Sequence, residues 1–260
     1  MIYAIGDIHG QHPLLCDLLR QIEQTPLRED DRLVFLGDYI DRDPDSKPVL
    51  DKLIALRDEY PNTIFLRGNH EQMMLDAFVA APPTHVEEDK LRISQATTNW
   101  QQEGGSETLR SYLKCFDDID QETHLRWRTF IPAEHWDFLC GTQLEFITDH
   151  YHFVHAGLLP AGCTEWQTMN PGRDPRLHIR DEFLSSKKDF GGRVVVFGHT
   201  PQIDTKQPLV NPNKLGLDTG AAFGGPLTAA AIDPANPVEG HIHHLFQAWP
   251  KLPTTSAAPR

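Results

Sequence analysis

The sequence has few cysteines, no long apolar run and fewer basic than acidic residues. Its four cysteines are scattered through 260 residues without a CxxC pair, which argues against a disulfide framework and against a cysteine-bound zinc ion. No stretch of about 18 uninterrupted apolar residues occurs, so no transmembrane helix is expected. The N-terminus lacks a basic segment followed by an apolar core. We therefore expect a cytoplasmic protein with no membrane association.

The deficit of basic residues gives a formal net charge of −13 at pH 7, from 24 Lys and Arg against 37 Asp and Glu. Non-specific binding to nucleic acid requires a basic face, so no nucleic-acid partner is expected. Anionic substrates are compatible with this charge, because bound cations can neutralise an acidic cluster locally.

Short apolar runs alternate with helical patterns over the first 80 residues. Apolar residues recur on one helix face in 13–23, and 47–60 and 71–80 also favour helices. Strands followed by helices at this spacing predict parallel strands and an α/β fold. The later strands are joined by loops with few helices, so part of the sheet is expected to be mixed or antiparallel. The expected strands are 2–5, 32–36, 62–66, 144–147, 151–155, 193–197, 215–219, 226–233 and 241–246.

The middle of the chain shows no convincing strand. We interpret 82–140 as a helical insertion that caps one part of the sheet, with tryptophans that either pack the insertion or stack an adenine. Residues 247–260 are rich in Pro, Ala and Thr and predict a flexible tail. These boundaries leave a single domain over 1–246.

Residues of metal-ligand type follow five of the apolar runs. The motifs are GDIHG (6–10), GDYIDR (37–42), RGNHE (67–71), VHAG (154–157) and VFGHTP (196–201). Ligands of an open α/β sheet bind outside the carboxyl ends of its strands, so these motifs should converge. One such motif is usually an ordinary turn, but five in the same strand-end position are poorly explained as turns. The expected metal ligands are Asp7, His9, Asp38, Asn69, His155 and His199.

Carboxylate, imidazole and amide oxygen together suit divalent ions such as Mn²⁺, Fe²⁺ or Zn²⁺. Six ligands are too many for one tetrahedral ion and fit two ions that share a carboxylate. Two ions about 3.5–4 Å apart can hold a hydroxide and stabilise an in-line displacement at phosphorus. Asp38 follows the middle strand of the first three and is the best candidate for the bridge.

Three neighbouring residues supply the other functions that hydrolysis of a phosphate ester needs. Arg42 can pair its guanidinium with phosphate oxygens. His70 lies beside Asn69 and can protonate the leaving oxygen as a general acid. Asp41 can orient His70 and raise its pKa. A surface ion pair between Asp41 and Arg42 is the alternative interpretation.

In order and spacing, the five motifs resemble the phosphoprotein phosphatase family of calcineurin-like metallophosphoesterases. The resemblance extends from residue 1 to about 233, and GNHEQMML (68–75) and NWQQEGGSETLRSY (99–112) place it in the bacterial serine/threonine phosphatase branch, which is related to symmetrical diadenosine tetraphosphate hydrolases. It implies a two-sheet α/β sandwich flanked by helices and a two-metal centre, commonly with Mn²⁺ in assays. It makes His70, paired with Asp41, the general acid. The resemblance implies that Asp7 and His9 bind the first metal, that Asp38 binds both, and that the second metal is bound by Asn69, His155 and His199.

The resemblance also makes Arg42 a phosphate ligand and implies a second arginine after HAG. Arg180 in LHIRDEFL is the best match, with Arg173 and Arg176 as alternatives. One departure concerns Asp43, which stands where the family usually has glycine. If that turn needs a positive φ, aspartate tolerates it less well than glycine, and a carboxylate near Arg42 could weaken phosphate binding.

The predicted activity is hydrolysis of serine/threonine phosphoproteins, or of phosphorylated small molecules, by direct attack of a metal-bridging hydroxide. The alternative is a symmetrical diadenosine tetraphosphate hydrolase. A binding protein with a silent centre is disfavoured, because every ligand position is filled. No pattern indicates the native metal pair or the oligomeric state. HIHH (241–244) could be a further metal clip, but a solvent-facing terminal strand is the preferred interpretation.

Overall fold

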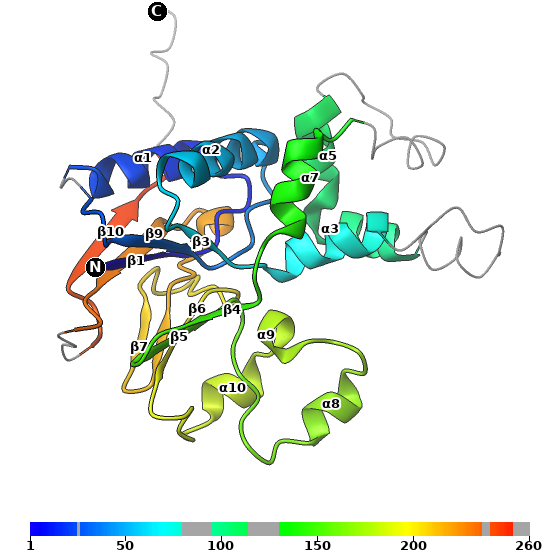
Figure 1. The fold of residues 1–260 in the computed structure, drawn as a ribbon. Helices are drawn as coiled ribbons and strands as arrows, with labels where there is room; N and C mark the ends of the chain where they lie inside the picture. The colour runs from blue at the N-terminus through cyan, green and yellow to red at the C-terminus, as the bar shows by residue number, and fades with distance from the viewer. Residues whose placement is uncertain (25–26, 80–94, 114–129, 236–239, 252–260) are drawn as a thin grey trace, which may run out of the picture.

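The computed structural model describes residues 1–24, 27–79, 95–113, 130–235 and 240–251. Two mixed sheets of five strands each pack face to face with helices outside them (Figure 1), which confirms the predicted two-sheet α/β fold. The strands are β1 (Ile2–Ile5), β2 (Arg32–Phe35), β3 (Ile64–Phe65), β4 (Glu145–Ile147), β5 (Tyr151–Val154), β6 (Val194–Phe197), β7 (Leu209–Asn211), β8 (Lys214–Gly216), β9 (Leu227–Ile232) and β10 (His244–Ala248).

The strand order is β10-β9-β1-β2-β3 in the first sheet and β4-β5-β6-β8-β7 in the second. β1, β2 and β3 are parallel to one another, as are β5, β6 and β8. The remaining neighbours pair antiparallel. The predicted parallel start and mixed remainder are both confirmed.

The helices are α1 (His12–Ile22), α2 (Ser46–Glu59), α3 (Asn69–Val79), α5 (Ser106–Leu113), α7 (Ala133–Cys140), α8 (Glu165–Met169), α9 (Pro175–His178) and α10 (Asp181–Ser185), with a π-helix η1 (Gln101–Gly105) and a 3₁₀ turn η3 (Ala221–Phe223). Proline near the start of α1 suits a helix N-terminus, where its missing N–H costs nothing. None of the helices in the described ranges has the length and apolar character needed to cross a bilayer.

The side chains of β1 alternate between two cores, as the two-residue period of a strand requires. Tyr3 and Ile5 pack in the core with α1 and α2, whereas Ile2 and Ala4 pack against the second sheet. A third core lies between the second sheet and α8–α10. Because strands of the first sheet are covered on both faces, they appear in the sequence as continuous apolar runs.

Within 82–140, the described residues 95–113 and 130–140 are largely helical, and η1, α5 and α7 pack beside α2 and α3 (Figure 1). The rest of the predicted cap, and 252–260 of the predicted tail, lie outside the described residues. The strand predicted over 241–246 is present but begins and ends later than predicted. β10 begins at His244, and His241 precedes it with φ 65°, its ring nitrogen 3.1 Å from the carbonyl of Asn211.

Candidate metal centre

Hydrogen bonds between the two sheets bring the predicted ligands together at the strand ends. His155, after β5, donates from Nδ1 to the carbonyl of Leu36 after β2 (2.8 Å). The amide of His199, after β6, donates to Oδ2 of Asp7 after β1 (2.9 Å). All six predicted ligands therefore lie at one edge of the sandwich. Five of the six are buried: Asp7, His9, Asp38, His155 and His199.

The backbone is left-handed at five site residues, a conformation that side chains other than glycine rarely adopt. The residues and their φ values are His9 (45°), Asp38 (52°), Asp41 (72°), Arg42 (71°) and His199 (61°). Each costs about 1–3 kcal/mol, so such residues persist where the surroundings hold them for a function. Asp43 is not among them. The turn therefore does not require glycine at position 43 for its φ angle.

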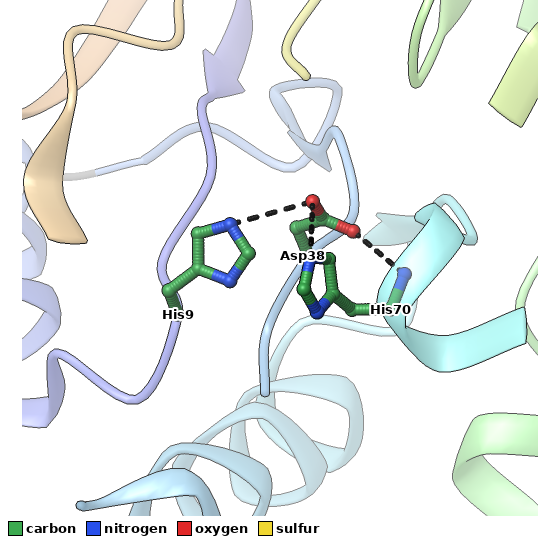
Figure 2. Close-up of side chains that lie close together, drawn as sticks. All are labelled: His9, Asp38 and His70. Atoms are coloured by element: carbon green, nitrogen blue, oxygen red, sulfur yellow. Dashed lines mark hydrogen bonds and ion pairs between the residues drawn. The ribbon is translucent and has the colours of Figure 1, made fainter. Parts of the chain in front are cut away.

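Asp38 lies at the centre of a first group of ligand-type side chains (Figure 2). His9 Nε2 lies 3.4 Å from Asp38 Oδ2, while His9 Nδ1 donates to the carbonyl of Ile40 (2.9 Å). The third member is His70, whose Nε2 lies 4.0 Å from Asp38 Oδ2 and whose amide donates to Oδ1 (3.1 Å). The sequence had paired Asp7, rather than His70, with His9.

Asp38 also belongs to a second group, with His155 and His199. His155 Nε2 lies 3.4 Å from Asp38 Oδ1. Asn69 Oδ1 lies between the two imidazoles, 3.0 Å from His155 Nε2 and 2.9 Å from His199 Nδ1. Gly68 permits this approach, because a Cβ there would lie 2.0 Å from Asp38 Oδ1. The two Asp38 oxygens thus face different groups, as a bridging carboxylate would.

Two buried polar atoms of the site have no hydrogen-bond partner within the described part of the chain: Oδ1 of Asp7 and Nε2 of His199. Buried polar atoms are nearly always paired, so these two need an explanation. A divalent cation supplies it, because both atoms can donate a lone pair. Carboxylate, imidazole and amide oxygen without sulfur are suitable ligands for such ions. The residues present therefore fit divalent metal ions.

The protonation states favour the same interpretation. Burial lowers the pKa of His9 and of His199 well below the ordinary value, which favours neutral rings that each keep one unprotonated nitrogen. Burial tends to raise the pKa of Asp38, but the nearby His155 and His70 outweigh it and hold the pKa well below its usual range. The central carboxylate is therefore ionised.

His70 differs from the other imidazoles. Burial lowers its pKa, but the charge of Asp38 and a 2.7 Å contact from Nδ1 to Asp41 Oδ2 outweigh burial and raise it. A protonated ring is unsuited to ligating a metal and suited to donating a proton. Asp41 is fully buried and accepts hydrogen bonds from Trp100 Nε1 (2.8 Å) and Thr108 Oγ1 (2.6 Å). The alternative of a surface ion pair is therefore wrong for Asp41.

The Arg42 guanidinium lies across the two imidazoles of the first group. Its Nη1 is 2.8 Å from His9 Nε2, and its Nη2 is 3.1 Å from His70 Nε2. The Arg42 amide donates to the carbonyl of Gly104 in η1 (3.2 Å), so the insertion helps to hold this turn. A partly exposed guanidinium beside the metal-ligand atoms is placed to meet an anionic substrate.

The three candidates for a second arginine occupy different surroundings. Arg176 forms a 2.7 Å ion pair with Asp174, so its guanidinium is already paired with a carboxylate. Arg173 is exposed in the loop before α9. Arg180 is exposed at the start of α10. Burial and the neighbouring His155 lower the pKa of His199 most, and the positive charge of Arg180 lowers it further. Arg180, whose charge acts on a predicted ligand of the second group, stays the preferred candidate.

Comparison with known proteins agrees with this geometry. The calcineurin-like phosphoesterase family matches residues 1–243. The chain belongs to this family. It is 30% identical over 242 residues to serine/threonine-protein phosphatase 1 of Salmonella typhimurium, covering 89% of this chain and 91% of the relative. It is also 30% identical over 308 residues to the symmetrical bis(5'-nucleosyl)-tetraphosphatase of Methylobacillus flagellatus, covering 92% and 96%.

A solved structure has the same fold as this phosphoesterase. The cold-active protein-tyrosine phosphatase of a psychrophilic Shewanella species superposes with a TM-score of 0.53 at 15% identity, covering 88% of this chain and 74% of that one. At this identity the likeness concerns the fold alone. Membership of the calcineurin-like phosphoesterase family makes this protein a hydrolase, and its histidine and aspartate groups fit metal ions.

The sequence did not indicate several buried residues that support the site residues through hydrogen bonds or through charge. Trp100 and Thr108 occur in a segment that the sequence marked for its bacterial character and, through its tryptophans, for packing or adenine stacking. Asp218 follows β8 and is buried. Burial raises the pKa of Asp7 most strongly, and the negative charge of Asp218 raises it further. A carboxylate after an apolar run was the signal that found the other motifs, and LGLDT (215–219) carries it.

Glu71 is a buried carboxylate that ties down the turn after β2. It accepts hydrogen bonds from the amides of Asp38 (2.9 Å), Tyr39 (2.8 Å) and Gly68 (2.8 Å). Burial and the charge of Asp38 nevertheless raise the pKa of Glu71 to about 7. The sequence showed Glu71 only as the start of a helix, although α3 begins two residues earlier.

We expect Glu71 to make the metal-free protein less stable as pH rises. Its folded pKa lies above its ordinary value of 4.5, so its contribution is full below pH 4.5 and is lost as pH rises through about 7. The free energy of unfolding of the wild type, minus that of Glu71→Gln, should fall by about 3 kcal/mol across this range. Denaturant unfolding at both ends of the range measures it. The exposed Glu59→Gln is the control, and a difference that rises with pH would contradict the expectation.

Proposed function

We propose that this phosphoesterase removes phosphate from phosphoserine and phosphothreonine residues of proteins, using two divalent ions. The observation that carries the proposal is Asp38, which belongs to both ligand groups while His70 and Arg42 lie beside it. The serine/threonine-protein phosphatase of Salmonella typhimurium, similar over nearly its whole length, supports the substrate class.

Two ions would lie on the two sides of Asp38, which would be shared between them. Bound ions would polarise phosphoryl oxygens and lower the pKa of water. Mn²⁺ is the first choice, with Fe²⁺ or Zn²⁺ as alternatives, because the ligands are nitrogen and oxygen atoms without sulfur. The proposed ligands are Asp7 and His9 for the first ion, and Asn69, His155 and His199 for the second.

The remaining residues would bind and protonate the substrate. The Arg42 guanidinium can hold two phosphoryl oxygens, and Arg180 would supply a second positive charge. His70 gives a proton to the departing serine or threonine oxygen, which is a poor leaving group without it. Asp41 holds the His70 ring by its 2.7 Å contact with Nδ1 and stabilises the protonated form.

A dinucleoside polyphosphate is the second candidate substrate, favoured by the similarity to a symmetrical tetraphosphatase. That substrate needs places for two nucleosides, and the sequence offered the insertion tryptophans for stacking. Trp100 is fully buried and bonded to Asp41, so it is unavailable. Trp136 is partly buried and packs on Phe78, with ring centroids 5.8 Å apart. The burial of Trp100 favours the phosphoprotein, while Trp127, the third tryptophan considered for stacking, lies outside the described residues.

Side-by-side hydrolysis of two substrates tests the proposal. The metal-stripped protein is refilled with Mn²⁺ and given a phosphothreonine peptide and diadenosine tetraphosphate at equal concentration. We expect the peptide to have the larger kcat/KM by about tenfold or more, a difference of about 1.4 kcal/mol in transition-state binding. Faster cleavage of the dinucleotide would overturn the substrate class, and no turnover with metals bound would overturn the proposed function.

A further inference from the structure

A buried lysine lies in β8, outside the proposed metal centre. Lys214 is 2% exposed, and lysine is rarely buried this fully unless it is paired. No carboxylate in the described part of the chain forms an ion pair with it, and burial lowers its pKa. Its Nζ donates instead to the backbone carbonyls of Leu184 (3.1 Å) and Ser186. Because an ammonium without a carboxylate is costly to bury, its place in the fold needs an explanation.

Two aromatic rings and two carbonyls surround this ammonium. Nζ lies 5.0 Å from the ring centroid of Phe183 and 5.7 Å from that of Phe190. The face of an aromatic ring attracts a cation, and the attraction grows when the cation is desolvated. The last carbonyls of a helix have no partner within the helix, and a lysine can bind them. Since Leu184 lies in α10 and Ser186 follows it directly, Lys214 ties the end of α10 to β8.

The other end of α10 is Arg180, the proposed second phosphate ligand. The Leu184 amide donates to the Arg180 carbonyl (2.8 Å), so a single residue joins Lys214 to Arg180. The Arg180 side chain is exposed and forms no ion pair with any residue that the structure describes. The position of its guanidinium therefore depends on the backbone, and the backbone depends on how α10 is seated.

The seat of α10 also includes the loop that carries His155. A Cβ built on Gly157, two residues after His155, would lie 2.4 Å from Cδ1 of Phe183. Phe183 is fully buried, and its ring meets Phe197 at the end of β6 edge to face, with centroids 5.1 Å apart. A shift of α10 would therefore move Arg180 relative to the second ligand group.

We propose that Lys214 is a positioning residue, which holds Arg180 in place for the bound phosphoryl group by anchoring α10 to β8. The inference rests on the role that the proposed function gives to Arg180. Lys214 is buried and bonded to backbone carbonyls, so it does not touch the substrate itself. Well-packed apolar residues often replace buried charges without loss of stability, so stability alone does not require an ammonium here. Directed bonds to two carbonyls define one position of the helix, which interchangeable apolar side chains would define less sharply.

The structural alternative is that Lys214 only helps the core between the second sheet and α10 to fold. A double-mutant cycle with Arg180 separates the two roles. A residue needed only for folding lowers the melting temperature, and its effect on phosphate binding is the same whether or not Arg180 is present. A residue that acts through Arg180 loses its effect on phosphate binding once the guanidinium has been removed.

Calorimetric binding of inorganic phosphate to the Mn²⁺-loaded protein gives the four affinities of this cycle. Arg180→Ala should weaken phosphate binding about tenfold, because a charged partner is lost. Lys214→Met keeps most of the side-chain length without the charge and should weaken binding about fivefold, because a mobile Arg180 has to be ordered on binding. In the Arg180→Ala background, the same substitution should change the affinity by less than about twofold. Lys188→Met is the matched control, since the exposed Lys188 also binds a backbone carbonyl, that of Ala161.

Lys214→Gln keeps an amide donor for the carbonyls and should show a smaller loss of affinity in the same direction. Circular dichroism and metal analysis check that each variant is folded and holds its ions. An unchanged phosphate affinity in Lys214→Met, or an equal loss in both Arg180 backgrounds, would overturn the inference. So would unfolding of both Lys214 variants, because Lys214 would then be a residue of the core alone. Failure of the proposed function looks different: phosphate binding that is unchanged in Arg180→Ala would remove Arg180 from the phosphate site, whatever the Lys214 variants show.

Discussion

Substitution of Asp38 by asparagine is expected to lower kcat by about 10³-fold or more, equivalent to about 4 kcal/mol, while the protein stays folded. An amide offers one coordinating oxygen and no charge, whereas the carboxylate faces both ligand groups with different oxygens. Bound metal should fall from two ions per chain toward one or none. The hydrogen bond from the His70 amide to Oδ1 can persist to an amide oxygen, so the turn is expected to keep its shape.

Three measurements on Asp38→Asn check this expectation: turnover of a phosphopeptide, metal content by elemental analysis, and thermal unfolding by circular dichroism. Asp30→Asn is the matched control, because Asp30 is exposed and lies outside both ligand groups. Near-normal turnover with two ions retained would show that Asp38 is not the bridging ligand.

Replacement of His70 by asparagine is expected to have an effect that depends on the leaving group. For phosphothreonine, kcat should fall by about 10²–10⁴-fold, because the departing alkoxide loses its proton donor. For p-nitrophenyl phosphate the loss should be smaller than about tenfold, since that leaving group needs little protonation. The observation behind this prediction is the 2.7 Å contact of His70 Nδ1 with Asp41, which together with the charge of Asp38 outweighs burial and raises the pKa of His70.

The ratio of the two kcat losses separates a proton donor from a metal ligand. If His70 ligated an ion, as its place in the first group would permit, both substrates would slow by the same factor and metal content would drop. The exposed His150→Asn serves as the control for histidine loss. Equal losses on both substrates would therefore remove His70 from the role of general acid.

The sequence predicted the parts of this site that follow strands directly. Asp7, Asp38 and His199 come after short continuous apolar runs, and a local pattern was enough to place them at one edge. Short strands were harder to predict from the sequence. β3 has only two residues instead of the five expected, and β7 was not predicted, because a three-residue exposed edge strand shows no usable alternation.

Supporting residues could not be predicted because their role arises from contacts between distant segments. Thr108 and Trp100 reach Asp41 across 67 and 59 residues of sequence. Phe223 meets Arg42 from the other end of the chain, in a turn whose composition, GAAFGG, indicates only a loop. The resemblance implied that Asp7 shares the first metal with His9, whereas the grouping of His70 with His9 and Asp38 emerged from the structure.

The hydrogen bonds that Trp100 and Thr108 donate to Asp41 also bear on how this family can be re-engineered. The insertion would be the natural segment to exchange between relatives in order to change substrate preference. Here it also supplies both side-chain donors from its own helices to the carboxylate that holds His70. Exchange of the insertion would therefore also change the hydrogen bonds that hold the proposed proton donor. A graft that preserves chemistry must carry the Trp100 and Thr108 positions with it.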